Sequence, residues 1–300
     1  AVIENAKAIP GFLEFFGIAN PSLNAAGEQI VEAGVPVFGA ASEYGVLRIC
    51  SMLAWGLGYF GMPQVLLRFM AIRKEEELKN SRRIAMIWVL ISLAVAVFIG
   101  IVGRQLYPTV HLTSTASENI FITLATSSLP PILAGFVMAG ILAATISSSD
   151  SYLLIASSAV AKNIYQGIFK KDAPDKKVMN VSRITLLVIA LIAMVIAWDE
   201  ESIIFNIVSF AWAGFGATFG PIMLFSLFWK RTNRAGAIAG MVGGAAMVFI
   251  WKLVISPLGG VFGIYELLPA FIFSSICIVV VSLLTPPPSK EIEEDFESIQ

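Results

Sequence analysis

The chain has 300 residues, of which 57% are apolar and 14% charged, with a formal net charge of -1. So small a charged share cannot cover the surface of a soluble domain, and the balanced charge excludes the broad basic field of a nucleic-acid binder. The two cysteines form no CxxC pair and His111 is the one histidine, which argues against a disulfide scaffold, a zinc centre and a histidine-dependent hydrolase. The composition therefore indicates an integral membrane protein.

Apolar stretches long enough to cross a membrane recur along the chain. A helix of about 20 apolar residues crosses a hydrocarbon layer of about 30 Å. Runs rich in Leu, Ile, Ala and Val without strict alternation favour helices over a β-barrel. We predict an all-α integral membrane protein whose transmembrane region, 46–285, contains about seven helices, at 46–71, 84–103, 130–161, 181–198, 203–229, 235–256 and 264–285.

The basic residues predict the orientation, because Lys and Arg are retained on the cytoplasmic side. Most of the 20 Lys and Arg residues follow the first, third and fifth spans or lie in the tail. The other connections, 104–129, 199–202 and 257–263, contain Arg104 and the acids Asp199, Glu200 and Glu201. We expect a multi-pass protein of the plasma (inner) membrane, with an extracellular segment at 1–45 and a cytoplasmic acidic tail at 286–300.

The beginning of the chain, Ala1-Val2-Ile3-Glu4, has neither a basic n-region nor an apolar h-region. An upstream segment is therefore expected to place residues 1–45 outside the cell. On this basis we expect the chain to be the C-terminal part of a longer membrane protein.

The first span is interrupted by three glycines and a proline, Gly56, Gly58, Gly61 and Pro63. Each glycine weakens a helix by about 1 kcal/mol relative to alanine, and proline removes a backbone donor. Residues 51–63 are therefore expected to unwind or kink, and freed backbone groups in mid-membrane can bind a solute or an ion. Trp55 and Tyr59, four residues apart, would wall a small pocket. The alternative is a glycine face for close helix packing, with both rings in the core.

The third span brings side-chain oxygens into the middle of an apolar run, at Thr145, Ser147, Ser148, Ser149, Asp150 and Ser151. Helix geometry places four residues on one face, with Asp150 beside it: Ala144, Ser147, Ser148 and Ser151. Hydroxyls and carbonyls are oxygen ligands that suit a hard cation such as sodium, and an acid at the bilayer centre costs at least about 2.5 kcal/mol. The alternative is that the hydroxyls donate to carbonyls one turn earlier and only soften the helix.

A third segment, 210–221, combines a small-xxx-small pair, Gly216 and Gly220, with Pro221. This helix can pack closely and bend. Both a gate and simple packing fit the pattern.

These three segments, in this order, resemble the sodium/solute symporter family, and within it most closely the sodium/proline symporters. The resemblance is carried by Trp55-Gly-Leu-Gly-Tyr-Phe-Gly-Met-Pro63, by Ala-Gly-Ile-Leu-Ala-Ala-Thr-Ile-Ser-Ser in the third span, and by Ser209-Phe-Ala-Trp-Ala-Gly-Phe-Gly-Ala-Thr-Phe-Gly-Pro221. It covers about residues 46–285. It implies a LeuT-like core of two inverted five-helix repeats, in which the first five spans are the second repeat and the last two are peripheral helices.

Carried over by position, the resemblance implies a substrate site at Trp55, Tyr59 and Pro63 and a sodium site at the Ala144 carbonyl, Ser147 and Ser148. Asp150 and Ser151 are candidates for a second cation site. The gate or hinge residues would be Gly56, Gly58, Gly216, Gly220 and Pro221. The family's other ligands lie on the first repeat, so this chain alone is not expected to transport.

The implied activity is sodium-coupled symport of proline by alternating access, with the lipid bilayer, proline or a similar small solute, and Na⁺ as partners and with no cofactor, no other metal and no nucleic acid. The alternatives are symport of another small organic solute and a solute-sensing membrane domain. A serine hydrolase would need a base beside Ser147 or Ser148, and that span contains no His or Lys to supply one. We therefore expect a transporter and not an enzyme.

Overall fold

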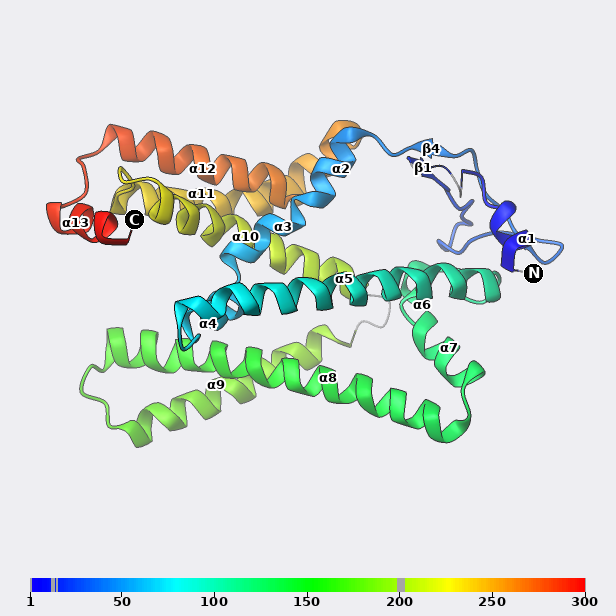
Figure 1. Cartoon of the computed structure of the whole chain (residues 1–300), viewed down its shortest axis with the longest axis horizontal. Coiled ribbons are helices and arrows are strands. Elements are labelled where there is room, and N and C mark those ends of the chain that lie inside the picture. Colours follow the sequence, from blue (N-terminus) through cyan, green and yellow to red (C-terminus); the bar gives the residue numbers. More distant parts are fainter. Residues whose placement is uncertain (1, 12–13, 15, 199–202, 300) are drawn as a thin grey trace. The chain divides into compact units, whose positions relative to one another are not determined.

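The computed structural model describes residues 2–11, 14, 16–198 and 203–299. The connection 199–202, predicted to be external, lies outside the described residues. The chain divides into two compact units. The first comprises Ala1–Ile9, Pro21–Gly39 and Ala85–Ile203, and the second comprises Pro10–Asn20, Ala40–Ile84 and Ile204–Gln300. Figure 1 traces the path of the chain through both.

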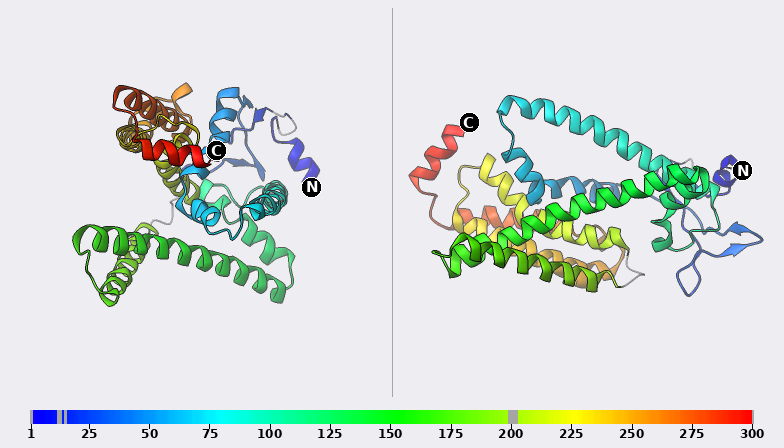
Figure 2. Two further views of the ribbon diagram at one scale, coloured as in Figure 1. Left: turned by 60° about the vertical axis from the view of Figure 1, so that its left-hand side comes forward. Right: turned by 90° about the horizontal axis from the view of Figure 1, so that it is seen from below.

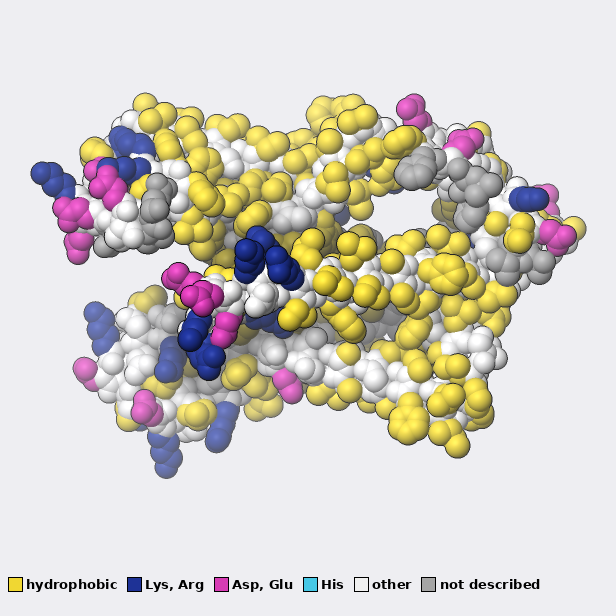
Figure 3. Space-filling model, in the orientation of Figure 1, with side chains coloured by type: hydrophobic (Ala, Val, Ile, Leu, Met, Phe, Trp, Pro, Cys, Tyr) yellow, Lys and Arg dark blue, Asp and Glu magenta, His cyan; other side chains and the backbone are white. Residues whose placement is uncertain are grey.

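Six helices of the described residues are long and apolar enough to cross a membrane, or seven if one bent pair, Val46–Gly61 with Pro63–Met70, is a single span. The six are Glu75–Leu106, Pro131–Phe169, Asp175–Ile196, Ile204–Phe228, Arg234–Leu258 and Leu267–Leu284. Apolar side chains cover the visible sides of the helices, and charged side chains gather toward helix ends (Figure 3). The predicted helical membrane class is confirmed, whereas the inverted-repeat arrangement stays a prediction.

In the first unit, the beginning of the chain folds against the end of helix α5 (Glu75–Leu106). It contains α1 (Val2–Lys7) and an antiparallel pair, β2 (Val31–Glu32) and β3 (Val35–Pro36), joined by Ala33 and Gly34, both at positive φ. The Asn5 side chain donates to the Gln105 carbonyl at 2.7 Å, and Arg104 donates to the Gln29 side chain. Part of the predicted external segment is thus tied to the end of a candidate span.

The remainder of the first unit is helical. Short helices α6 (Ser114–Ser117) and α7 (Ile120–Ser128) lead into α8 (Pro131–Ser158). Helix α8 is unbroken and continues as a π-helix, η2 (Ala159–Phe169), before α9 (Asp175–Ile196) returns alongside it. Ser182 donates to the buried Ser157 hydroxyl at 3.2 Å, which joins α9 to α8.

The second unit is built around three helices that lie side by side, α10 (Ile204–Phe228), α11 (Arg234–Ile250) and α12 (Leu267–Leu284) (Figure 2). Their shared core contains Ala213, Ala217, Val248, Leu267, Ala270 and Phe271. Helix α11 continues through a π-helix, η3 (Trp251–Ile255), and a 3-10 turn, η4 (Ser256–Leu258), and a second 3-10 turn, η5 (Gly260–Phe262), leads toward α12. The strands β1 (Gly17–Ile18) and β4 (Ser42–Glu43) pair before the first span. The acidic tail forms α13 (Lys290–Ile299), and its Glu293 and Glu297 form ion pairs with Lys230.

The first span is broken, and the break lies within the predicted segment 51–63. It consists of α2 (Val46–Leu53), α3 (Trp55–Gly58), a 3-10 turn η1 (Tyr59–Gly61) and α4 (Pro63–Met70). The glycines remain helical, and the bend of 53° falls at Met62, which is extended at φ -84° and ψ 116°. Proline disfavours a helical conformation in the residue before it and begins a new helix readily, which explains the break at Met62. The kink expected within residues 51–63 is therefore present at Met62, whereas the glycines do not unwind the helix.

The glycines instead allow the broken segment to touch α10. A Cβ at Gly61 would lie 2.9 Å from the Cα of Gly216 and from the nitrogen of Gly220, and closer still to the Phe215 carbonyl oxygen. A Cβ at Gly216 would lie 2.7 Å from the Cα of Gly58. Helix α10 runs through Pro221 without interruption. Gly58, Gly61, Gly216 and Gly220 thus have a packing role, and their role as a gate stays a prediction.

Replacing Gly61 by alanine tests this packing. Because the added methyl group meets backbone atoms of α10, we expect a loss of about 1–3 kcal/mol of stability, typical of overpacking. Gly56→Ala is the matched control, since a Cβ at Gly56 meets nothing within 4 Å and alanine favours a helix by up to about 1 kcal/mol. The thermal unfolding midpoint of the purified protein in detergent should fall for Gly61→Ala and hold or rise for Gly56→Ala. Equal midpoints would contradict the close contact.

Candidate functional site

An aromatic cluster fixes the middle of the broken segment. The Trp55 ring stacks on three rings at centroid distances of 5.5–5.6 Å, those of Phe205, Trp212 and Tyr265. The Trp212 Nε1 also donates to the Trp55 carbonyl at 3.0 Å, and the Tyr59 ring meets Trp212 edge-on at 4.8 Å. Since both the ring and the backbone of Trp55 are held, its orientation is fixed before any solute arrives.

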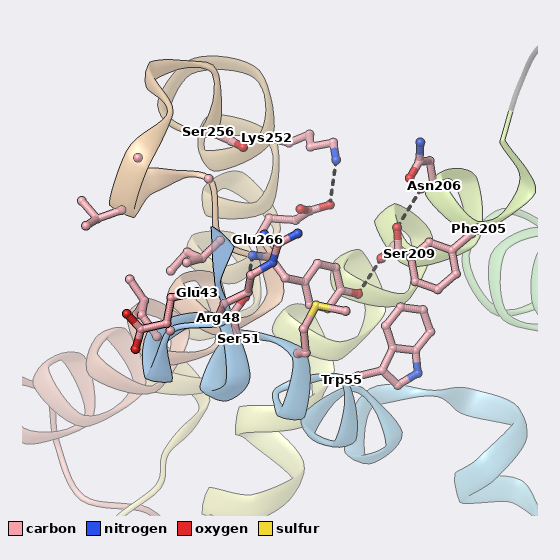
Figure 4. A pocket seen from close by; sticks show the side chains of 18 residues that line it. Glu43, Arg48, Ser51, Trp55, Phe205, Asn206, Ser209, Lys252, Ser256 and Glu266 are labelled. Atoms are coloured by element: carbon pink, nitrogen blue, oxygen red, sulfur yellow. Dashed lines mark hydrogen bonds and ion pairs between the residues drawn. The ribbon is translucent and has the colours of Figure 1, made fainter. Parts of the chain in front are cut away.

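A cavity of about 540 Å³ lies beside Trp55 within the second unit. Its walls come from α2, the first turns of α10, η3 and the residues before α12 (Figure 4). Its lining combines aromatic rings with charged and hydroxyl groups, among them Trp55, Phe205, Tyr265, Glu43, Arg48, Lys252, Glu266, Ser51 and Ser209. Its volume and mixed lining suit a small polar organic molecule.

Tyr265 joins three parts of this cavity. Its backbone N–H donates to the buried Ser51 hydroxyl on α2 at 2.7 Å, and its phenolic O–H donates to the Ser209 carbonyl on α10 at 2.7 Å. Burial raises the pKa of Tyr265 above its ordinary value, and the charge of the adjacent Glu266 raises it further. The hydroxyl therefore stays protonated at physiological pH and remains a donor.

An ion pair also lines this cavity. The Lys252 Nζ lies 3.6 Å from Glu266 Oε1, and the Glu266 side chain is 4% exposed whereas that of Lys252 is 42% exposed (Figure 4). Among the described residues Glu266 Oε1 has no hydrogen-bond donor. A buried carboxylate needs a positive partner, so Lys252 and the beginning of α12 offset its charge.

The predicted substrate residues are only partly brought together. Trp55 lines the cavity, and Tyr59 joins it through their shared neighbour Trp212, although Tyr59 is 49% exposed. Pro63 is the first residue of α4, beyond the bend, and does not line the cavity.

The predicted sodium residues lie on α8, in the first unit. Ser147, Ser148 and Asp150 are exposed there. Thr145 donates to the Ile141 carbonyl at 3.0 Å and Ser151 donates to the Ser147 carbonyl at 3.1 Å. The back-bonding alternative is therefore correct for the Thr145 and Ser151 hydroxyls.

Five polar residues that line the cavity were not predicted from the sequence: Ser51, Ser209, Lys252, Tyr265 and Glu266. One signal was available for two of them. Lys252 lies inside an apolar span and Glu266 at the beginning of another, and ionisable groups in such places are seldom incidental. No pattern marks Ser51, Ser209 or Tyr265, which meet only through the tertiary fold.

These features define a multi-pass membrane protein with one helix broken beside a small cavity. The chain matches the sodium:solute symporter family over residues 31–244 and belongs to that family, which confirms the predicted resemblance. It is 42% identical to the high-affinity proline transporter PutP of Bacillus subtilis over 255 residues, covering 85% of this chain and 53% of that protein. It is 40% identical to the sodium/proline symporter of Staphylococcus aureus over 260 residues, covering 85% of this chain and 51% of that protein. The chain spans about half the length of the curated relatives it matches.

Proposed function

We propose that the chain is part of a symporter that couples sodium entry to uptake of proline or a similar small solute across the plasma membrane. The observation that carries this proposal is the broken helix, whose fixed Trp55 lines a cavity of small-solute size in a member of this family. Alternating access is the proposed mechanism, with the N-terminal segment outside and the tail in the cytoplasm, as the distribution of Lys and Arg favours.

The substrate would lie against the Trp55 ring, which lines the cavity, and extend toward the bend. Proline carries an apolar ring and two opposite charges, so it needs an aromatic surface and separate polar partners. Trp55 and Tyr59 supply aromatic surface, and the bend at Met62 begins a new helix, α4, whose N-terminal dipole favours an anionic group. We therefore assign Trp55, Tyr59 and the region of Pro63 to substrate binding.

Sodium would bind on α8. The exposed hydroxyls of Ser147 and Ser148 and the exposed Asp150 lie in the middle of a candidate span of 39 residues. Polar groups at that depth are costly against lipid, so this face needs protein, water or an ion opposite it. Two adjacent hydroxyls and the Ala144 carbonyl supply oxygen ligands that suit sodium, and other ligands would come from a facing helix.

Packing limits which parts can move during alternating access. Because Gly58 and Gly61 contact Gly216 and Gly220 at backbone distance, α3, η1 and α10 would move together. The bend at Met62 and Pro63 is then the natural hinge of this segment. The work comes from the sodium gradient, at about 2.3 kcal/mol per charge for each 100 mV.

Uptake into vesicles tests the function. The full-length protein reconstituted in proteoliposomes should accumulate radiolabelled proline when a sodium gradient is imposed, and should not do so with potassium in its place. Competition by unlabelled solutes of similar size would establish the preferred solute. Sodium-independent uptake, or binding of proline without accumulation, would contradict symport.

Ser148→Ala tests the sodium site. Loss of one oxygen ligand should raise the sodium concentration for half-maximal uptake by about tenfold or more, since a bond to a charged group contributes about 1.5–3 kcal/mol. Proline affinity should fall less. Ser149→Ala is the matched control, because Ser149 is also exposed on the same helix but lies off the predicted ligand face. The assignment is wrong if the two variants have the same sodium dependence.

Asp150→Asn tests the second cation site. A carboxylate beside Ser147 and Ser151 would attract a further sodium ion or a proton, so its removal should lower the Hill coefficient for sodium or flatten the pH dependence of uptake. Both are measured in the same vesicles. If neither changes, Asp150 has a structural role only.

A further inference from the structure

The last candidate span, α12, is fastened to the broken segment rather than lying apart from it. Leu267 is fully buried, and a Cβ at Gly216 would lie 2.9 Å from its Cδ1. Phe271 covers the next glycine of α10, since a Cβ at Gly220 would lie 2.7 Å from its Cε2. The first two turns of α12 therefore cover the same glycine face of α10 that receives Gly58 and Gly61.

The two residues that precede α12, Tyr265 and Glu266, line the cavity and contact the elements around it. Tyr265 contacts α2 through Ser51, contacts α10 through the Ser209 carbonyl and stacks on Trp55 at 5.6 Å and 20°. Glu266 pairs with Lys252 on η3, so the end of the α11 segment and the beginning of α12 are linked across the connection. The two residues after Tyr265 therefore anchor it, Glu266 through the ion pair with Lys252 and Leu267 through its packing against α10.

The Trp55 ring is held from two different elements. Trp212 holds Trp55 from α10 and Tyr265 holds it from the beginning of α12, both by stacking. The hydrogen bond from Tyr265 N–H to Ser51 fixes α2 one turn before Trp55. Replacing the Tyr265 side chain would free one face of the Trp55 ring, while the backbone bond to Ser51 and the contacts from α10 would remain.

We propose that Tyr265 is a positioning residue for solute binding, which holds the Trp55 ring in its binding orientation through the ring stack and the Ser51 bond. The α11–α12 connection, part of a region that the resemblance treats as peripheral, is thereby a structural part of the substrate site. This inference builds on the proposed role of Trp55 in contacting the solute.

The test uses three variants of the full-length protein. Tyr265→Leu removes the stack and the phenolic bond, Tyr265→Phe removes only the bond to Ser209, and Ser51→Ala removes only the acceptor of the Tyr265 N–H. Tyr107→Phe is the matched control, because Tyr107 lies in the first unit and its hydroxyl contacts the exposed Ser127. Each variant is compared with the unmodified protein by proline uptake and by hydrogen–deuterium exchange of the amides at 51–61.

For Tyr265→Leu we expect the KM for proline to rise about tenfold, with the maximal rate and the sodium half-saturation within about twofold of the unmodified protein. Ser51→Ala and Tyr265→Phe should raise the KM about two- to fivefold. Amides at 51–61 should exchange faster in Tyr265→Leu and in Ser51→Ala, while those of α11 and the Tyr107→Phe control should not change. If Tyr265→Leu does not reach the membrane in folded form, Ser51→Ala decides.

Two results would overturn the proposal: unchanged exchange at 51–61 in folded variants, or faster exchange with an unchanged KM, which would make Tyr265 a stability residue only. Failure of the proposed function looks different. In that case the unmodified protein shows no sodium-driven proline uptake, and the exchange measurement, which needs no substrate, still decides whether Tyr265 holds the Trp55 segment.

Discussion

The close contact between the backbone of the broken helix and that of α10 is the constraint on which the second unit depends. Gly58 and Gly61 on one side and Gly216 and Gly220 on the other leave no room for a side chain between them. Only small residues allow such contacts, which bring many main-chain atoms into van der Waals range. The broken segment can therefore stay helical through its glycines although each of them weakens a free helix.

That contact also determines where the aromatic rings go. With glycines facing α10, the larger side chains of the segment project at the edges of the contact, where Trp55 and Tyr59 meet Trp212. Helix α12 then completes the arrangement, because Leu267 and Phe271 cover Gly216 and Gly220 of α10 and leave Tyr265 and Glu266 at the cavity. The cavity is thus a consequence of helix packing, and its polar lining comes from the ends of the packed helices.

The sequence predicted the helices well because apolar length is a property of each segment alone. It also predicted a break within residues 51–63, but not that the glycines stay helical, since the support that α10 gives to Gly58 and Gly61 cannot be read from local propensity. Proline acts on the preceding residue in every context, and Pro63 therefore places the break at Met62. The Tyr265–Ser51 bond joins residues 214 positions apart, beyond the reach of any local pattern.

The row of hydroxyl groups on α8, at Thr145, Ser147, Ser148 and Ser151, fits both a back-bonding role and a ligand role. Thr145 and Ser151 donate to carbonyls of their own helix, which is the ordinary behaviour of such residues in an apolar segment. A hydroxyl that donates in this way still presents its oxygen lone pairs, so back-bonding orients the oxygen rather than removing it as a ligand. Ser147 and Ser148 are adjacent and exposed, and the carbonyl that Ser151 satisfies belongs to Ser147. An ion held by this row would therefore see oxygens whose directions are set by the helix, which is the preorganisation that a selective site for a weakly bound cation requires.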